Sequence, residues 1–198
     1  MTASLPQAPH QYTFADYLTL ERESETKHEF YAGEILAMSG GTARHSALAA
    51  RMIVAMGNTA ASGTVFTSDM RVRVAATGRA TYPDISMVCG PIEYDADDAV
   101  HTTVTNPLLL VEILSPTTEK DDRGDKWMHY QQIASLQEYV LVSQEPRIEI
   151  FRRTPSNTWG TSRCARGTCV SRPGRRSMSR RFTPIFRPIF RSRQRSPV

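Results

Sequence analysis

Glu112 is the residue whose position most clearly implies chemistry, because its carboxylate stands inside an apolar segment. Residues 107–116 read Pro-Leu-Leu-Leu-Val-Glu-Ile-Leu-Ser-Pro, a run typical of a strand buried on both faces. An ionised carboxylate left unpaired in such a place costs several kcal/mol or more. Glu112 therefore needs a cation, a proton or a metal ion as its partner.

A second carboxylate, Asp84, begins the preceding strand candidate in the segment TYPDISMV, residues 81–88. If the two strands are neighbours, Asp84 and Glu112 point at one spot and can hold a hard divalent cation such as Mg²⁺, which takes oxygen ligands and keeps several waters. Such an ion polarises a phosphoryl oxygen and lowers the pKa of an attacking water. A nearby lysine would complete the site, because its ammonium stabilises charge that develops on the phosphate.

Four segments, in this order, resemble the Uma family of restriction endonuclease-like proteins, which is placed in the PD-(D/E)xK nuclease superfamily. They are Tyr-Pro-Asp at 82–84, NPLLLVEILSPTT at 106–118, DRGDKWMHY at 122–130 and LQEYVLV at 136–142, and the resemblance covers about residues 12–153. It implies an endonuclease that depends on Mg²⁺, or alternatively Mn²⁺, and hydrolyses DNA phosphodiester bonds with a metal-activated water. It also implies a homodimer, in which each subunit cuts one strand.

The resemblance assigns roles to four residues. Asp84 and Glu112 match the two acids that bind the metal. The superfamily pattern places a lysine two residues after the second acid, where alternation aims it at the same face, but Leu114 occupies that position here. Lys126 matches the lysine of the family's Asp-Arg-Gly-x-Lys segment and is the expected replacement. Glu29 matches an N-terminal family acid and is a candidate accessory ligand.

Asp84 and Glu112 also have purely structural interpretations. Asp84 follows a proline and could simply cap a turn. Glu112 could be neutralised by Arg71 or Arg73 in a buried ion pair, since ion-pair networks also bury acids. These interpretations compete with the metal site and predict different partners for the two carboxylates.

The remaining candidates have structural interpretations as well. Lys126 lies four residues after Asp122, so the two could form no more than an ion pair on a helix surface. Glu29 could be a solvated strand residue. His45 begins an apolar helix face, which is typical of a packing histidine, although it could also support the site behind the metal ligands. Tyr130 is expected to be a core residue, and we leave both out of the predicted site.

The elements that must position these residues follow from periodicity and turn signals. Thr13 and Asp16 form a capping-box pattern, which predicts a helix from Thr13 to about Ser24. Apolar residues at three- and four-residue spacing predict a second helix over 42–61. We further expect a hairpin over 27–38, strands over 64–75, 82–89 and 107–114, a helix over 122–133, and strands over 138–143 and 147–152. This order predicts an α/β fold with a restriction-endonuclease-like mixed β-sheet flanked by helices.

The chain divides by composition at Trp159. Residues 1–159 carry 13 basic and 20 acidic side chains, whereas residues 160–198 carry eleven arginines and no Asp, Glu or Lys. We expect residues 1–159 to form one restriction-endonuclease-like domain and the Arg/Pro/Ser-rich residues 160–198 to form no core. This tail is either a disordered basic arm that binds phosphates or the product of an altered reading frame, and its abrupt loss of acids favours the altered frame.

The composition argues against several other classes of protein. No apolar run is long enough for a transmembrane helix and no signal-peptide pattern begins the chain, so we expect a cytoplasmic protein without a membrane partner. Three cysteines form neither a disulfide framework nor a zinc pattern and are expected to be free thiols. Ser115 lies in no Gly-x-Ser-x-Gly motif, and no phosphate-binding glycine loop is present.

Two other interpretations of function stay open. A catalytically inactive nucleic-acid-binding or regulatory module could keep the same fold, and a missing response to metal would favour it. A truncated or frameshifted chain could instead be a non-functional nuclease.

Overall fold

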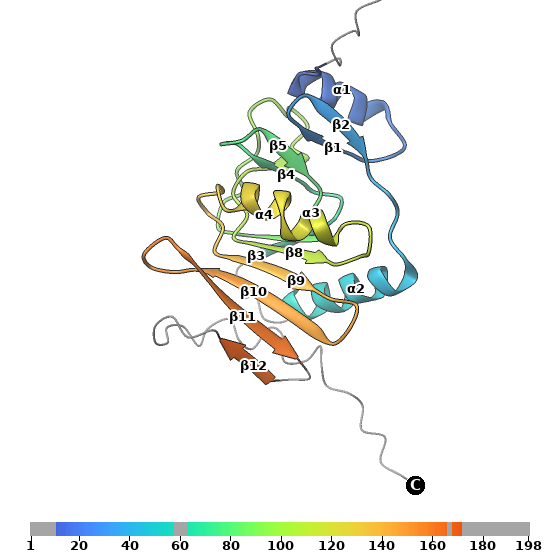
Figure 1. Ribbon diagram of the computed structural model, residues 1–198. Helices are drawn as coiled ribbons and strands as arrows, with labels where there is room; N and C mark the ends of the chain where they lie inside the picture. The colour runs from blue at the N-terminus through green and yellow to red at the C-terminus, as the bar shows by residue number, and fades with distance from the viewer. Residues whose placement is uncertain (1–10, 58–62, 166–167, 172–198) are drawn as a thin grey trace, which may run out of the picture.

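The computed structural model describes residues 11–57, 63–165 and 168–171, whose helices and strands form successive layers (Figure 1). Two sheets lie on either side of the short helices α3 (Glu119–Arg123) and α4 (Asp125–Tyr130). Helix α1 (Phe14–Glu23) packs on the first sheet and α2 (Ala43–Gly57) on the second. The mixed α/β class predicted from the sequence is confirmed, and its strands are divided between two sheets.

The first sheet has five strands in the order β2-β1-β5-β4-β7. Helix α1 begins with the predicted capping box, in which the Asp16 N–H donates to Thr13 Oγ1 and the Thr13 N–H donates to Asp16 Oδ2. Its apolar face packs on Phe30 and Ala80. The strands are β1 (His28–Tyr31), β2 (Glu34–Ala37), β4 (Arg71–Val74), β5 (Arg79–Thr81) and β7 (Thr103–Val104).

The second sheet has seven strands in the order β12-β11-β10-β9-β8-β6-β3. Because side chains alternate between the two faces of a strand, Leu109, Val111 and Ile113 of β8 pack with Met52 and Met56 of α2, and the residues between them face the middle layer. Glu112 therefore points toward α3 and α4. The strands are β3 (Gly63–Thr67), β6 (Ile85–Cys89), β8 (Leu109–Ile113), β9 (Glu138–Val142), β10 (Arg147–Arg153), β11 (Trp159–Ala165) and β12 (Thr168–Ser171).

The chain changes sheet within or beside two of the predicted strands. The segment 64–75 turns between Thr67 and Met70, where the Met70 N–H donates to the Thr67 carbonyl at 3.1 Å, so β3 and β4 belong to different sheets. The segment 82–89 contributes only β6, which begins after Pro83, a residue without an N–H to donate. Periodicity predicted extended backbone in both segments but not the change of sheet.

The helix predicted over 122–133 is two short helices separated by Gly124. This glycine has φ −108° and ψ −98°, and a Cβ added to it would lie 2.9 Å from the Lys120 carbonyl oxygen. A side chain at this position would therefore clash with the preceding turn. The break places Asp122 on α3 and Lys126 on α4, with both side chains buried in the middle layer.

The second sheet continues past the boundary expected at residue 159. Strand β11 pairs antiparallel with β10 from Arg147↔Ala165 to Arg153↔Trp159, and β12 pairs with β11. We therefore end the sheet at Ser171. Both interpretations of the tail were made for residues 160–198; β11 and β12 occupy the first part of that range, and residues 172–198 lie outside the described residues. Cys164 is disulfide-bonded, contrary to the expectation of free thiols, whereas Cys89 is a free cysteine.

Within the described ranges, none of the helices is long and apolar enough to cross a membrane.

Candidate active site

Asp84 and Glu112 lie side by side on neighbouring strands, as the sequence predicted they would if the strands paired. Strands β6 and β8 are antiparallel with Ile85 opposite Val111, so one step further along places Asp84 beside Glu112. The Ile113 N–H donates to Asp84 Oδ2 at 2.7 Å, and the Asp84 N–H donates to Glu112 Oε2 at 3.3 Å. Each carboxylate is thus held by the backbone of the other strand.

Lys126 reaches Glu112 from the middle layer and joins it to two further acids. Its Nζ lies 3.4 Å from Glu112 Oε1, 3.1 Å from Glu29 Oε1 and 3.3 Å from Asp122 Oδ1. Glu29 comes from the first sheet, Glu112 from the second, and Asp122 and Lys126 from the helices between them. We call these four residues the carboxylate–lysine cluster. All four side chains are buried.

The charges of this cluster do not balance, because three carboxylates face one ammonium. Burial raises the pKa of Glu112 well above its usual value, and it also raises the pKa of Asp122, with Lys126 opposing both shifts. Burial alone would lower the pKa of Lys126, but Glu112, Glu29 and Asp122 raise it well above the usual value. Lys126 therefore stays protonated, and the cluster is short of positive charge.

Neighbouring polar groups hold the cluster in place. Tyr130 OH donates to Glu112 Oε1 at 3.0 Å and also shares a hydrogen bond of 2.8 Å with Thr81 Oγ1. Arg79 Nη2 lies 3.6 Å from Glu29 Oε2, but its closer partner is Asp121 Oδ2 at 2.7 Å. Arg79 therefore compensates Glu29 only in part.

His45 contacts the other acid of the pair. Its Nε2 lies 3.1 Å from Asp84 Oδ2, and this hydrogen bond raises the pKa of His45 above its usual value. The side chain extends from the first turns of α2, which packs on the opposite face of the sheet from α4. His45 thus approaches Asp84 from the side away from Lys126.

The structure brings together all four residues predicted for the site, and it rules out most of the competing partners. Arg71 lies 3.8 Å from Asp98, and Arg73 lies 3.0 Å from Asp95, so neither neutralises Glu112. Glu29 and Lys126 are 9% and 6% exposed. The solvated strand residue and the surface ion pair are therefore both incorrect interpretations.

Three residues of the site were not predicted from the sequence. Asp122 was considered only as a surface partner of Lys126 and Tyr130 only as a packing residue, whereas His45 was considered both as a packing residue and as a group that supports the site without touching the metal. The four-residue spacing of Asp122, Lys126 and Tyr130 places them on one helical face, and this is the signal that could have grouped them. No local pattern could have linked His45 to Asp84, which lies 39 residues away in the chain.

The donors of the site suit a hard divalent cation. Asp84 and Glu112 offer carboxylate oxygens, and the buried atoms Glu29 Oε1 and Asp122 Oδ1 are paired with the Lys126 ammonium at 3.1 and 3.3 Å. The described residues contain no group of three or more His, Cys, Asp or Glu side chains arranged to hold a metal ion. Mg²⁺ commonly binds through one or two carboxylates together with waters and substrate phosphates, so the Asp84 and Glu112 pair fits this ion.

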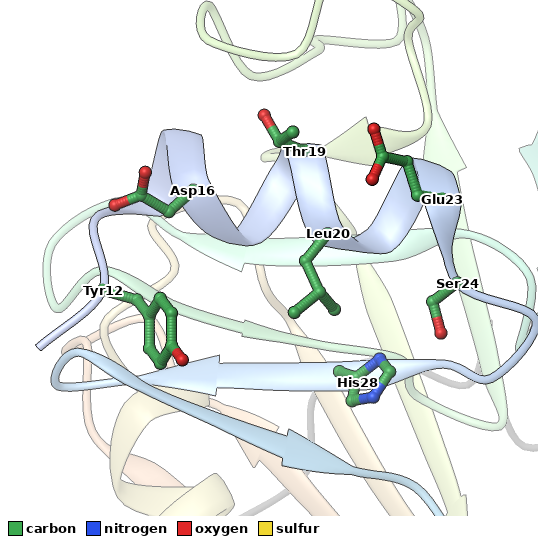
Figure 2. A pocket seen from close by; sticks show the side chains of 7 residues that line it. All are labelled: Tyr12, Asp16, Thr19, Leu20, Glu23, Ser24 and His28. Carbon is green, nitrogen blue, oxygen red and sulfur yellow. The ribbon is translucent and has the colours of Figure 1, made fainter. Parts of the chain in front are cut away.

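An open pocket of about 540 Å³ lies elsewhere, between α1 and β1. Figure 2 shows Leu20 extending from α1 toward the strand that carries His28. His28 and Glu29 are adjacent in β1, so their side chains leave opposite faces of the strand. The first sheet thus separates this pocket from the carboxylate–lysine cluster, and the pocket is not part of the site.

Comparison with known proteins places the chain among nuclease-like relatives. The family Uma2, described as "Putative restriction endonuclease", matches residues 14–177. Two uncharacterized proteins of Synechocystis sp. are similar in sequence: one is 34% identical over 80% of this chain and 84% of its own length, and the other is 31% identical over 74% and 84%. A crystal structure from Anabaena variabilis, titled as a putative nuclease belonging to DUF820, has the same fold with a TM-score of 0.57 and 18% identity, covering 73% of this chain and 83% of the other.

Proposed function

This chain belongs to the Uma2 family, and we propose that it is a metal-dependent endonuclease that hydrolyses DNA phosphodiester bonds at the carboxylate–lysine cluster and Asp84. The observation that carries the proposal is the buried surplus of carboxylates: Glu29, Glu112 and Asp122 surround one ammonium, beside Asp84. A buried negative surplus is costly in a purely structural role. It is expected where a protein binds a cation.

Asp84 and Glu112 would hold the divalent ion, Mg²⁺ or Mn²⁺. When bound, this ion supplies an activated water and polarises a phosphoryl oxygen. The two acids are suited to the role because they are oriented by backbone N–H groups of Ile113 and Asp84. Tyr130 OH donates a further hydrogen bond to Glu112. Such support holds the ligands in place before the substrate arrives.

Lys126 would stabilise negative charge on the reacting phosphate. Its pKa is raised by three carboxylates, so it acts as a cation and does not serve as a base. Glu29 helps to keep the ammonium charged and directed toward Glu112. In the reaction, the oxygen of water forms a bond to phosphorus, the bond from phosphorus to the leaving oxygen breaks with its electron pair on that oxygen, and the proton lost by water is balanced by protonation of the leaving group.

The test is plasmid cleavage with and without Mg²⁺ or Mn²⁺, comparing the wild type with Glu112→Gln and Glu138→Gln. Glu138 is a matched control because it is also a buried glutamate whose pKa is raised by burial. It lies outside the proposed site, at the first residue of β9, and is paired with Arg152. We expect metal-dependent cleavage by the wild type and Glu138→Gln, and at least a hundredfold loss in Glu112→Gln, which is on the order of 3 kcal/mol of transition-state stabilisation.

Other outcomes select the alternatives. If no variant cuts and Glu112→Gln is more stable than the wild type, the acid is a cation ligand in a catalytically inactive binding or regulatory module. If no variant cuts and Glu112→Gln is less stable, Glu112 is a structural ion-pair residue and the proposal fails. A truncated or frameshifted, non-functional nuclease would show no cutting together with a poorly cooperative unfolding transition.

We also propose a homodimer, since cleavage of both DNA strands needs two such sites. Light scattering of the purified protein, with and without DNA, measures this directly. A monomer that releases only nicked plasmid would overturn the dimer while leaving the site intact.

A further inference from the structure

Three arginines surround one buried glutamate on the second sheet. Glu149 of β10 accepts a hydrogen bond from Arg123 Nη2 at 2.8 Å and another from Arg163 Nε at 3.1 Å, and Arg147 Nε lies 3.7 Å away. We call these four residues the arginine cluster. It draws its arginines from α3, β10 and β11.

The arginines exceed what Glu149 needs for neutralisation. Arg123 supplies the shortest contact and is also paired with Glu119 at 2.7 Å. Arg147 and Arg163 have side chains that are 51% and 67% exposed, and both approach Glu149 through Nε. In the described part of the chain, their terminal Nη groups have no hydrogen-bond partner in the protein. These planar forks match the geometry of a phosphate group.

The arginine cluster lies on the same face of the sheet as the catalytic candidates. Glu112 is opposite Leu141, Leu141 is opposite Glu149, and Glu149 is opposite Arg163, so all four side chains share one face. Neighbouring strands are about 4.8 Å apart, which puts Arg163 roughly 14 Å from Glu112. Helix α3 contributes to both clusters, because Asp122 contacts Lys126 and Arg123 contacts Glu149.

The two clusters also lie at the same end of the sheet. Strands β8 and β9 are parallel, and the Leu114 N–H donates to the Val142 carbonyl at 2.9 Å where both strands end. Arg147 begins β10 directly after the following turn. In Figure 1 the ends of β8 and β9, the start of β10 and the end of β11 all point to the same side of the molecule.

We propose that Arg123, Arg147 and Arg163 bind the phosphate backbone of duplex DNA and hold it beside the carboxylate–lysine cluster. The proposal deepens the nuclease function above and rests on it for the identity of the polymer. Glu149 orients the arginines through its two oxygens and leaves the Nη groups of Arg147 and Arg163 directed to the ligand. Such contacts position the duplex without reading its sequence.

The test measures DNA binding by the full chain in EDTA, so that binding is separated from cleavage. The affinity for a short fluorescent duplex is recorded over a series of salt concentrations for the wild type, Arg147→Gln with Arg163→Gln, and Arg147→Lys with Arg163→Lys. Arg22→Gln with Arg51→Gln is the matched control, because it removes two exposed arginines from α1 and α2. Arg123 is left in place so that Glu149 keeps a partner and the fold is maintained.

We expect the glutamine pair to reduce the slope of log affinity against log salt by about 1.8, since each phosphate contact contributes about 0.9. The lysine pair should keep most of the slope because it keeps the charge. The arginine-rich residues after 171 are common to all variants and contribute equally. A slope equal to that of the control pair would overturn the proposal, and so would an effect on binding to phosphatidylglycerol vesicles but not to DNA.

Plasmid cleavage distinguishes this proposal from the function on which it rests. If the wild type cuts DNA but has the same salt slope as the glutamine pair, only the proposed arginine site is overturned. If the wild type does not cut DNA but the salt slope of the glutamine pair is lower than that of the wild type, the arginine site is supported and the proposed nuclease function is overturned.

Discussion

The carboxylate–lysine cluster and the arginine cluster occupy the same face of one sheet but have opposite charge balance and different burial. The first has three carboxylates around Lys126, and all of these side chains are buried. The second has three arginines around Glu149, and two of them are more than half exposed. A buried surplus must be offset by a proton or a cation, whereas an exposed surplus is solvated and free to bind. Burial therefore distinguishes the cluster proposed for chemistry from the cluster proposed for DNA docking.

The largest effect should come from removing β11 and β12, which supply Arg163 and part of the sheet. A chain that ends at Trp159 loses the pairing of β10 with β11 and the buried Cys164. We expect its melting temperature to fall by roughly 10 °C or more, as several kcal/mol would cause in a chain of this size. A chain that ends at Ser171 keeps both strands and should have the same melting temperature as the full chain. Equal melting of all three would show that residues after 159 are dispensable, as the composition suggested.

Lys126→Met should produce the next largest effect, because it leaves three carboxylates buried without their ammonium. Removal of one partner from a buried ion pair costs about 3–5 kcal/mol, measurable by urea unfolding at neutral pH. The loss should shrink as pH falls, since the carboxyl groups can then take up protons. Lys120→Met, which removes an exposed lysine of α3, is the control. A loss similar to that of the control would mean that the cluster is not electrostatically coupled to folding.

Glu112→Gln should raise stability, with a defined dependence on pH. The folded-state pKa of Glu112 is raised by burial above the ordinary value of 4.5. Between the unfolded-state and folded-state pKa values, the folded state therefore binds more protons than the unfolded state. Wild-type stability therefore falls as pH rises above 4.5. At pH 8 the variant should be more stable by at least about 1 kcal/mol. Thermal melts across pH measure this, and Mg²⁺ should raise the melting temperature of the wild type but not of Glu112→Gln.

Glu149→Gln should have a smaller effect with the opposite sign. Burial acts to raise the pKa of Glu149, but Arg123 and Arg163 outweigh it and lower that pKa below the usual value. The carboxylate therefore contributes stability above its unfolded pKa, and this contribution is lost as pH falls through the folded pKa. We expect the variant to be destabilised by about 1 kcal/mol or less at pH 7 and to match the wild type in acid. Parallel pH profiles for Glu112→Gln and Glu149→Gln would contradict the distinction between the clusters.

The local features of this structure could be predicted from the sequence. The capping box of α1, the hairpin of β1 and β2, and the apolar face of α2 depend on spacing and turn residues, and each lies where the pattern predicted. Asp84, Glu112, Lys126 and Glu29 were also named from the sequence, through the apolar context of Glu112 and the resemblance of the motifs. Their proximity then followed from strand pairing and helix position.

Other features depended on contacts between segments distant in the chain. Alternation shows that the two faces of a strand differ, but it does not say what covers each face. Glu29 is buried because α4 packs over β1, and the segment 64–75 is divided because its turn carries the chain from one sheet to the other.

The charge balance of the site also depended on contacts between segments distant in the chain. The sequence determined that Glu112 needs a partner, whereas only the tertiary structure decided that this partner is Lys126, shared with Glu29 and Asp122, and not Arg71 or Arg73. It also decided that Glu149 collects arginines from three elements. The physical reason is that burial and pairing are set by the side chains that pack together, and these come from segments far apart in the chain.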